Sequence, residues 1–286
     1  MLRHLTQFYR PQTVQEACTL LEDKTRKNVP LAGGTYLTQI DDATIDGLVD
    51  LKGLQLSSIR ADSGGFRIGA MTPVFDVATS TVLTGPAGAL LREAAKRIGS
   101  TPLRHSITVG GNLVGVFPWS DLPPALLVLE AEVTLANAHR KRTIPLTTLY
   151  ATRPNDVIER GEIMTEIHVP AMPTGSKNGT AFIKMAKTAN DYAIITVATR
   201  LTFNGGIISA ARIAINAPTR KPTRCRDAED SLKGKQITPE LLAEAGVRAI
   251  SGIEFTPDFR ASKEYRMDVL PVVVRRALEQ AAKANA

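Results

Sequence analysis

The sequence Thr108-Val109-Gly110-Gly111-Asn112 places a β-branched pair directly before two glycines and a short amide. This order predicts a strand that ends in a tight loop. Glycine carries no Cβ, so Gly110 and Gly111 would let main-chain N–H groups face one point and let a ligand approach the backbone closely. The stretch therefore predicts a loop suited to a phosphate group.

A second stretch repeats this design nearer the N-terminus. It reads Val29-Pro30-Leu31-Ala32-Gly33-Gly34-Thr35-Tyr36, a predicted strand followed by another glycine pair. Taken singly, each pair could be an ordinary tight turn, because glycine is common in turns. Two such loops together could hold a pyrophosphate from two sides.

Length and composition indicate a globular chain of more than one domain. The chain has 286 residues, of which 43% are hydrophobic, enough for a substantial core. No apolar run approaches the roughly 18 residues that a membrane span needs, and the N-terminus lacks an apolar signal core. We therefore expect no membrane span and a cytoplasmic location.

The residues that bind metals are few and scattered. Cys18 and Cys225 are far apart, and the four histidines show no ligand spacing. We expect no metal site in this chain, so any redox function would need an organic cofactor. The formal net charge is +7, but the basic residues are dispersed and only 5% of residues are aromatic. This favours an anionic cofactor or an acidic partner over nucleic acid.

The distribution of predicted elements indicates an α+β fold. A loop-forming cluster at 170–175 predicts a boundary, with domains at 1–174 and 175–286. After it, strands are expected at 180–185, 194–203 and 207–216, and helices at 224–233, 239–250 and 272–283. Strands followed by helices predict an antiparallel sheet backed by helices.

Asp121 allows two interpretations. It lies in Phe117-Pro118-Trp119-Ser120-Asp121-Leu122-Pro123-Pro124, where it could cap a helix that begins at the prolines. Its carboxylate could instead accept hydrogen bonds from a sugar or ribityl hydroxyl.

Several catalytic motifs are absent. The chain has no strand-linked G-x-G-x-x-G, no G-x-x-x-x-G-K-[ST] and no nucleophile elbow. We therefore expect no catalytic acid, base or nucleophile of its own.

The ordered set of motifs resembles the FAD-binding medium subunit of the molybdenum hydroxylases, the xanthine dehydrogenase and aerobic carbon monoxide dehydrogenase family. The resemblance rests on the two glycine loops and the Ser120–Pro124 stretch. It continues through four further segments: 161–167, 191–193, 217–219 and 260–266.

The resemblance implies a fold and a cofactor, FAD. The fold would be an FAD-binding domain of the vanillyl-alcohol-oxidase (PCMH) type in two α+β subdomains, followed by a CO dehydrogenase flavoprotein C-terminal domain. Matching positions imply FAD contacts at Val29, Pro30, Leu31, Ala32, Gly33, Gly34, Thr35, Tyr36, Thr108, Val109, Gly110, Gly111, Asn112, Asp121, Met164 and Lys184. Tyr192 could lie near the isoalloxazine or be a core tyrosine of the sheet.

Two departures from the family pattern matter. Many relatives carry an acidic or polar residue in place of Tyr36. The segment after the central loop has no cysteine-bearing insertion, so no additional iron–sulfur cluster is expected.

The implied function is that of an electron outlet. The chain would accept electrons from the [2Fe-2S] clusters of a small subunit and pass them to NAD, a quinone or another acceptor. Substrate would be oxidised in a molybdenum cofactor-binding large subunit, and the complex would be a dimer of heterotrimers. The alternatives are a stand-alone FAD-dependent oxidase or reductase, and an interaction subunit without flavin.

Overall fold

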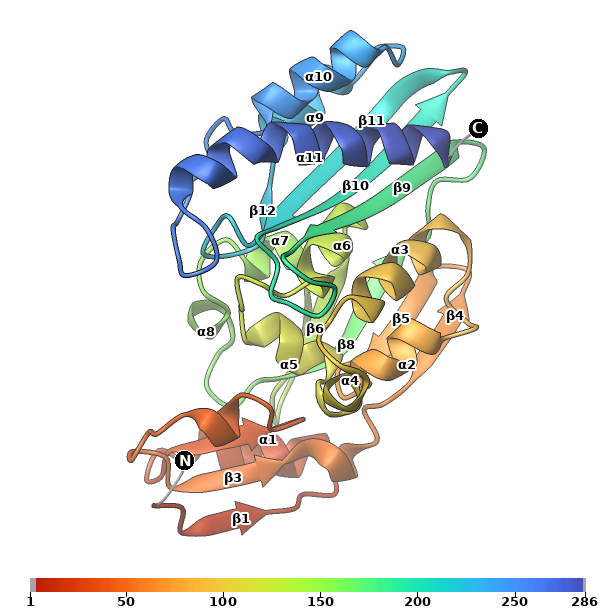
Figure 1. Ribbon diagram of the computed structural model, residues 1–286. Coiled ribbons are helices and arrows are strands. Elements are labelled where there is room, and N and C mark those ends of the chain that lie inside the picture. Colours follow the sequence, from red (N-terminus) through yellow and green to blue (C-terminus); the bar gives the residue numbers. More distant parts are fainter. Residues whose placement is uncertain (1–3, 285–286) are drawn as a thin grey trace.

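The computed structural model describes residues 4–284, which form three β-sheets with helices between and around them (Figure 1). The first sheet is parallel, with strand order β1-β3-β2, and α1 precedes β2. Pro30 lies in β2, an edge strand, where its missing N–H is tolerated. The elements of this subdomain are β1 (Gln7–Tyr9), α1 (Val14–Glu22), β2 (Asn28–Leu31), η1 (Leu37–Gln39), β3 (Gly47–Asp50) and η2 (Leu51–Leu54).

The second subdomain is built on an antiparallel sheet of order β4-β5-β8-β6-β7. Its strands are β4 (Ile59–Asp62), β5 (Gly65–Gly69), β6 (Glu132–Ala136), β7 (Lys141–Pro145) and β8 (Ile163–Pro170). Its helices are α2 (Val74–Thr79), α3 (Gly85–Lys96), α4 (Thr101–Ser106), α5 (Val109–Val114), α6 (Leu122–Val128), α7 (Leu146–Leu149) and α8 (Pro154–Val157).

The third unit is an antiparallel sheet of order β12-β11-β10-β9, and α11 lies across it (Figure 1). The turn between β10 and β11 is formed by Gly205 and Gly206, which both have positive φ. The elements are β9 (Lys177–Met185), β10 (Ile195–Asn204), β11 (Ile207–Asn216), β12 (Thr223–Arg224), α9 (Arg226–Leu232), α10 (Pro239–Arg248) and α11 (Lys263–Lys283). The predicted α+β class with an antiparallel sheet backed by helices is confirmed.

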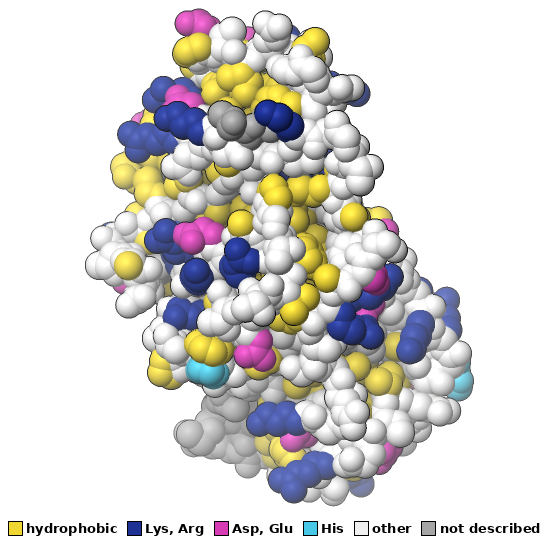
Figure 2. Space-filling view, turned by 90° about the vertical axis from the view of Figure 1, so that its right-hand side faces the viewer, with side chains coloured by type: hydrophobic (Ala, Val, Ile, Leu, Met, Phe, Trp, Pro, Cys, Tyr) yellow, Lys and Arg dark blue, Asp and Glu magenta, His cyan; other side chains and the backbone are white. Residues whose placement is uncertain are grey.

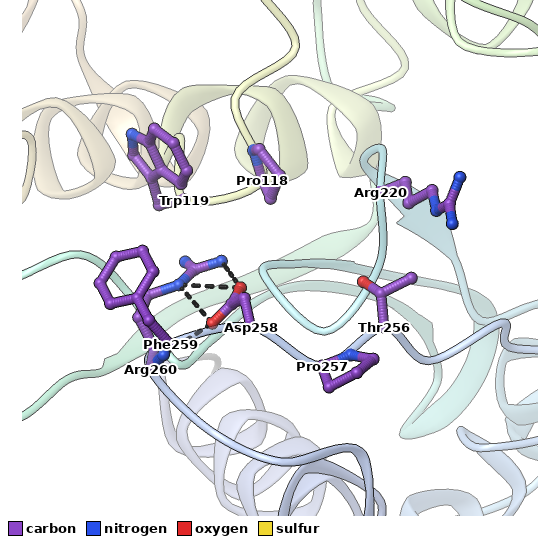
Figure 3. Close-up of a pocket in the computed structure, with 8 residues that line it drawn as sticks. All are labelled: Pro118, Trp119, Arg220, Thr256, Pro257, Asp258, Phe259 and Arg260. Carbon is purple, nitrogen blue, oxygen red and sulfur yellow. Dashed lines mark hydrogen bonds and ion pairs between the residues drawn. The ribbon is translucent and has the colours of Figure 1, made fainter.

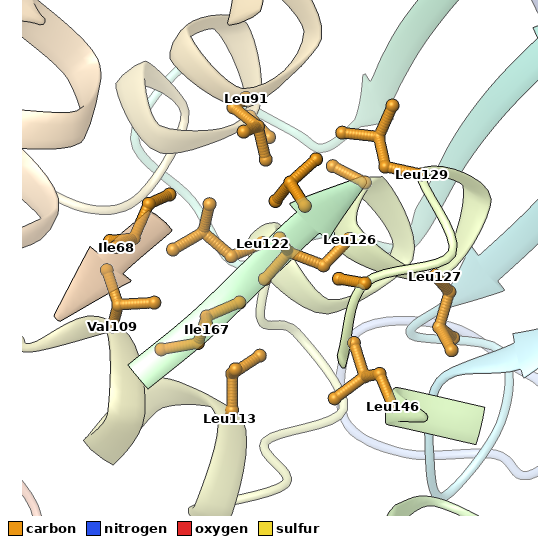
Figure 4. Close-up of a cluster of buried hydrophobic side chains, with 14 of the residues drawn as sticks. Ile68, Leu91, Val109, Leu113, Leu122, Leu126, Leu127, Leu129, Leu146 and Ile167 are labelled. Atoms are coloured by element: carbon orange, nitrogen blue, oxygen red, sulfur yellow. The ribbon is translucent and has the colours of Figure 1, made fainter. Parts of the chain in front are cut away.

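The main hydrophobic core joins the second and third units. Leucines of α3, α5 and α6 pack on β5 and β8 (Figure 4), and the same cluster includes Ala198 of β10 and Ala214 of β11. Helices α3 and α6 also contact the third sheet directly. The N-terminus of α6 is therefore held between the two units, and this position determines where Asp121 lies.

One expected element is wrong. Thr108 and Val109 do not end a strand; Thr108 is the N-cap of α5, and its side-chain oxygen accepts a hydrogen bond from the Gly111 N–H. Burial of Val109 in the core accounts for the β-branched residue there. A threonine before a buried valine suits a helix N-cap as well as a strand, and tertiary packing decided between the two.

None of the helices within residues 4–284 combines the length and the apolar character that crossing a membrane would require.

Candidate functional site

The two glycine stretches lie against each other. A Cβ added at Gly33 would lie 1.7 Å from the carbonyl oxygen of Ser106, so the first loop packs directly on the backbone that leads into α5. Gly34 has a φ of +71°, a conformation that glycine adopts without strain. A Cβ at Gly111 would lie 3.9 Å from the Cβ of Ala32. The structure therefore brings together the two glycine pairs that the sequence analysis paired. The predicted tight loop at Gly110 and Gly111 is wrong, because both residues lie in the first turn of α5.

The two glycines of α5 have different roles. Gly110 is buried, its N–H donates to the Ala70 carbonyl oxygen at 2.8 Å, and a Cβ there would lie 2.9 Å from that oxygen. Gly110 thus permits close packing, and its N–H is not turned towards a common point with that of Gly111. Gly111 is exposed, and its N–H is held by the Thr108 hydroxyl at 3.2 Å.

The space around Gly111 fits a phosphate group of FAD. An added Cβ would meet only the Thr108 hydroxyl oxygen at 2.9 Å and the Ala32 Cβ at 3.9 Å. The backbone of α5 is therefore open on the side that faces the first loop. A phosphate group can approach such a backbone, because no side chain fills the space.

The remaining residues of the first stretch follow the course of β2. Val29, Pro30 and Leu31 pair with Leu48, Val49 and Asp50 of β3. Ala32, Gly33, Gly34 and Thr35 form the loop after β2 and are partly buried. Tyr36 is 53% exposed, and its ring meets Phe117 edge-on at 5.0 Å between centroids.

Asp121 and Lys184 form a buried ion pair. The Lys184 Nζ lies 2.9 Å from the Asp121 Oδ2, and the side chains are 5% and 1% exposed. The Lys184 Nζ also donates to the Arg97 carbonyl oxygen at 2.7 Å, and the Thr196 hydroxyl donates to the Asp121 Oδ1 at 3.0 Å. Lys184 and Thr196 are register partners on β9 and β10. A carboxylate from α6 is thus fixed to the third sheet.

The expectation that the Asp121 side chain caps a helix is wrong. The residue occupies the N-cap position of α6, but its side chain makes no capping hydrogen bond. Its carboxylate contacts Lys184 and Thr196 instead. Burial raises the pKa of Asp121 to about 6, against the opposing effect of Lys184.

Asp121→Asn should flatten part of the pH dependence of stability. The pKa of Asp121 is higher in the folded chain than the usual value of about 3.9, so the folded state holds the proton more tightly. The contribution of the Asp121 carboxyl to the stability of the folded chain is fully present below about pH 4. It is lost as the pH rises through about 6. The two-unit pKa difference corresponds to about 3 kcal/mol.

The measurement is the free energy of unfolding of both proteins in urea between pH 4 and pH 7. The advantage of the native chain over Asp121→Asn should shrink by about 3 kcal/mol across this interval. A constant difference would show that the Asp121 carboxyl does not titrate there.

A hydrogen bond connects the central glycine stretch to the residue that precedes Asp121. The Ser120 hydroxyl donates to the Asn112 Oδ1 at 2.6 Å. Met164 is not part of this network: it is 6% exposed and belongs to the main hydrophobic core. The structure therefore brings together the two glycine stretches, Asn112, Asp121 and Lys184, and places Met164 in the core.

The contact of Phe117, Trp119 and Tyr192 in a row of aromatic rings was not predicted from the sequence. Phe117 and Trp119 stack with centroids 5.6 Å apart, and Trp119 lies 4.6 Å from Tyr192. Tyr192 is 53% exposed, so its interpretation as a core tyrosine is wrong. Aromatic residues are scarce in this chain, and the closeness of Phe117 and Trp119 in sequence was a usable signal.

Two other side chains were missed because their partners are distant in sequence. The buried Asn216 Nδ2 donates to the Ser120 carbonyl oxygen at 2.8 Å and to the Phe117 carbonyl oxygen at 3.2 Å. The Arg260 guanidinium donates to the Ala193 carbonyl oxygen at 2.5 Å and lies 5.3 Å from the Trp119 ring centroid. Both fix the aromatic row from the third unit.

Comparison with protein families covers both parts of the chain. Residues 4–172 match the FAD binding domain in molybdopterin dehydrogenase. Residues 180–281 match the CO dehydrogenase flavoprotein C-terminal domain.

Individual relatives match over nearly their full length. The carbon monoxide dehydrogenase medium chain of Afipia carboxidovorans is 31% identical over 283 residues, which are 98% of this chain and 97% of the relative. The xanthine dehydrogenase FAD-binding subunit of Escherichia coli O157:H7 is 25% identical, over 97% of this chain and 96% of its own. Carbon monoxide dehydrogenase from Hydrogenophaga pseudoflava, in a form lacking the Mo-pyranopterin moiety, superposes with a TM-score of 0.91 at 30% identity, covering all of both chains.

The fold and the paired glycine loops, together with these matches, define a flavin-binding protein that takes part in oxidation and reduction. The chain belongs to the family of FAD-binding medium subunits of molybdenum hydroxylases. Its cofactor is FAD, and it is a flavoprotein subunit of the oxidoreductase class.

Proposed function

We propose that this chain is the electron outlet of a molybdenum hydroxylase complex. In this assignment it accepts electrons from the [2Fe-2S] clusters of a small subunit and passes them to NAD, a quinone or another acceptor. A large subunit that binds the molybdenum cofactor would oxidise the substrate, and the complex would be a cytoplasmic dimer of heterotrimers. Relatives named as medium chains or FAD subunits support this assignment.

The observation that carries the proposal is the contact between the two glycine loops. Gly111 leaves the backbone of α5 open towards Ala32, while Gly33 locks the first loop to Ser106. These two stretches would hold the pyrophosphate of FAD, with residues 29–36 on one side and 108–112 on the other. Bound FAD would supply chemistry that accepts electrons singly and releases them in pairs.

The buried ion pair would fix the far side of the cofactor site. Lys184 and Asp121 are linked to the central stretch through Ser120 and Asn112. A movement of the third sheet would therefore also displace the glycine stretches. In this proposal Asp121 hydrogen-bonds a cofactor hydroxyl, Lys184 lies beside the cofactor, and Met164 contributes an apolar surface. Asp121 would keep its bonds to Lys184 and Thr196, since breaking a buried pair is costly.

The first experiment measures the cofactor and the activity of the purified chain. We expect a flavin absorption spectrum between about 300 and 600 nm, with one FAD released per chain on denaturation. The chain alone should not oxidise carbon monoxide, xanthine or glyceraldehyde, and the bound flavin should be reduced only when a reduced iron–sulfur partner is added.

Two results would contradict the proposal in different ways. Substrate turnover by the single chain would favour a stand-alone oxidase or reductase. A chain that neither carries FAD nor takes it up when FAD is added would instead be an interaction subunit.

A further inference from the structure

A pocket opens beside Trp119 of the aromatic row (Figure 3). Its volume is about 600 Å³, within the range of small-molecule sites. Three separate segments line it: the turn before α6, the loop between β11 and β12, and the loop before α11. The lining residues are Pro118, Trp119, Arg220, Thr256, Pro257, Asp258, Phe259 and Arg260. None of them is a residue assigned above to FAD.

One wall of the pocket is a fixed network of charges. The Asp258 carboxylate contacts both Arg260 and Arg266, and the Arg266 side chain is 0% exposed. Arg260 is also held by the Ala193 carbonyl oxygen. The bonds of Asp258 and Arg260 are dashed in Figure 3. This wall is formed before any ligand binds, which lowers the entropic cost of binding.

Arg220 stands on the opposite side of the pocket (Figure 3). It is exposed, and within residues 4–284 its side chain makes no hydrogen bond or ion pair. The one carboxylate that lines the pocket is already paired with Arg260 and Arg266. The guanidinium of Arg220 is therefore available to an anionic group, which it can bind through two parallel hydrogen bonds.

The remaining lining residues are mostly apolar. They include Pro118, Pro257 and two aromatic rings, and Trp119 and Phe259 lie beside the Arg260 guanidinium in Figure 3. Phe259 is 79% exposed, so its ring is available to a ligand. Aromatic rings of this kind give a planar ligand a surface to pack against.

We propose that this pocket is a second ligand site, distinct from the FAD site, for a planar aromatic molecule that carries an anionic group. The ring packs on the aromatic and proline side chains of the lining, and the anionic group is bound by Arg220. Such a ligand matches both the apolar lining residues and the available positive charge.

The test is titration calorimetry on the full chain, with and without saturating FAD. Two matched pairs of probes are used: AMP with adenosine, and 2-naphthoate with 2-naphthamide. We expect at least one anion to bind about tenfold more tightly than its neutral counterpart, a factor worth about 1.4 kcal/mol. Trp119 is the single tryptophan of the chain, so its fluorescence in the FAD-free protein reports whether a probe enters this pocket.

Two variants of exposed arginines locate the charge. Arg220→Ala should weaken binding of the anion about tenfold and leave binding of the neutral probe unchanged. The fold should be kept, because Arg220 is exposed. Arg276→Ala is the control, since Arg276 is exposed on α11 and does not line the pocket. It should change nothing. If both variants lose the same affinity for the anionic probe, the effect comes from the net charge of the chain, and the proposal is wrong.

The probes also separate the sources of the ligand. Binding of AMP alone indicates a nucleotide, binding of 2-naphthoate alone indicates an aryl carboxylate, and either result supports the site. If neither anion binds at millimolar concentration, the proposal is wrong. It is also wrong if FAD saturation abolishes anion binding, because the pocket would then belong to the flavin site. Anion binding by a chain that fails to bind FAD would refute the proposed function and leave this inference intact.

Discussion

Gly111→Asp is expected to abolish FAD binding while the fold is retained. The side chain would project from α5 into the space that faces Ala32, where the proposed site holds the pyrophosphate. The new carboxylate would place like charges together, which costs several kcal/mol and corresponds to at least about 100-fold in affinity. The readouts are FAD released per chain and the far-ultraviolet circular dichroism spectrum.

Gly111→Ala is the matched control. Its Cβ would lie 2.9 Å from the Thr108 hydroxyl oxygen, which caps α5 and must shift, while alanine favours the helix; the two effects oppose each other, so stability should change little. FAD affinity should fall much less than in Gly111→Asp. Unchanged FAD stoichiometry in the aspartate variant would reject the assignment of Gly111 to the pyrophosphate.

Lys184→Met is expected to have the second largest effect. The substitution keeps most of the side-chain volume but leaves Asp121 buried without its cation. Removing one partner of a buried pair costs roughly 3 kcal/mol or more of stability. The pKa of Asp121 should rise further, so the loss should be larger at pH 8 than at pH 5. Urea unfolding at both pH values measures it.

A control and a double variant separate structure from cofactor binding. Lys187→Met changes an exposed lysine that lines the same small pocket as Lys184, and it should have little effect on stability. The double variant Asp121→Asn with Lys184→Met removes both charges and should regain much of the lost stability. If FAD affinity recovers fully with it, Lys184 acts only through the fold; if it stays weak, Lys184 contacts the cofactor.

The secondary structure could be predicted from the sequence where local signals were strong. The sequence Thr13-Val14-Gln15-Glu16 has the spacing of a capping box, and the Thr13 side chain accepts a hydrogen bond from the Glu16 N–H at the start of α1. The three long strands of the third sheet lie close to their expected bounds. The helix α11 extends back to Lys263, ahead of Pro271, because its buried face continues through that proline. Because of this proline, the first turns of the helix were not predicted from the sequence.

The candidate site could be predicted from the sequence only in part. The glycine pairs after apolar runs marked both stretches of the site, since their chemistry is local to a few residues, but only the first pair lies in a loop and the second lies in α5. The partners of Asp121 were not predictable, because Lys184 and Thr196 lie 63 and 75 positions away. The periodicity of a sequence does not indicate which side chains pair when they lie so far apart along the chain.

The sequence by itself determined the strands and helices of the third unit, the position of the two glycine pairs and the absence of recognisable catalytic motifs, because each depends on neighbouring residues. Only the tertiary structure decided that Thr108 caps a helix, that Gly110 serves packing while Gly111 stays open, and that Asp121 is buried against Lys184. These outcomes depend on which surfaces meet when α5 and α6 pack between two sheets. Burial and charge pairing act through space, and the chain order does not specify them.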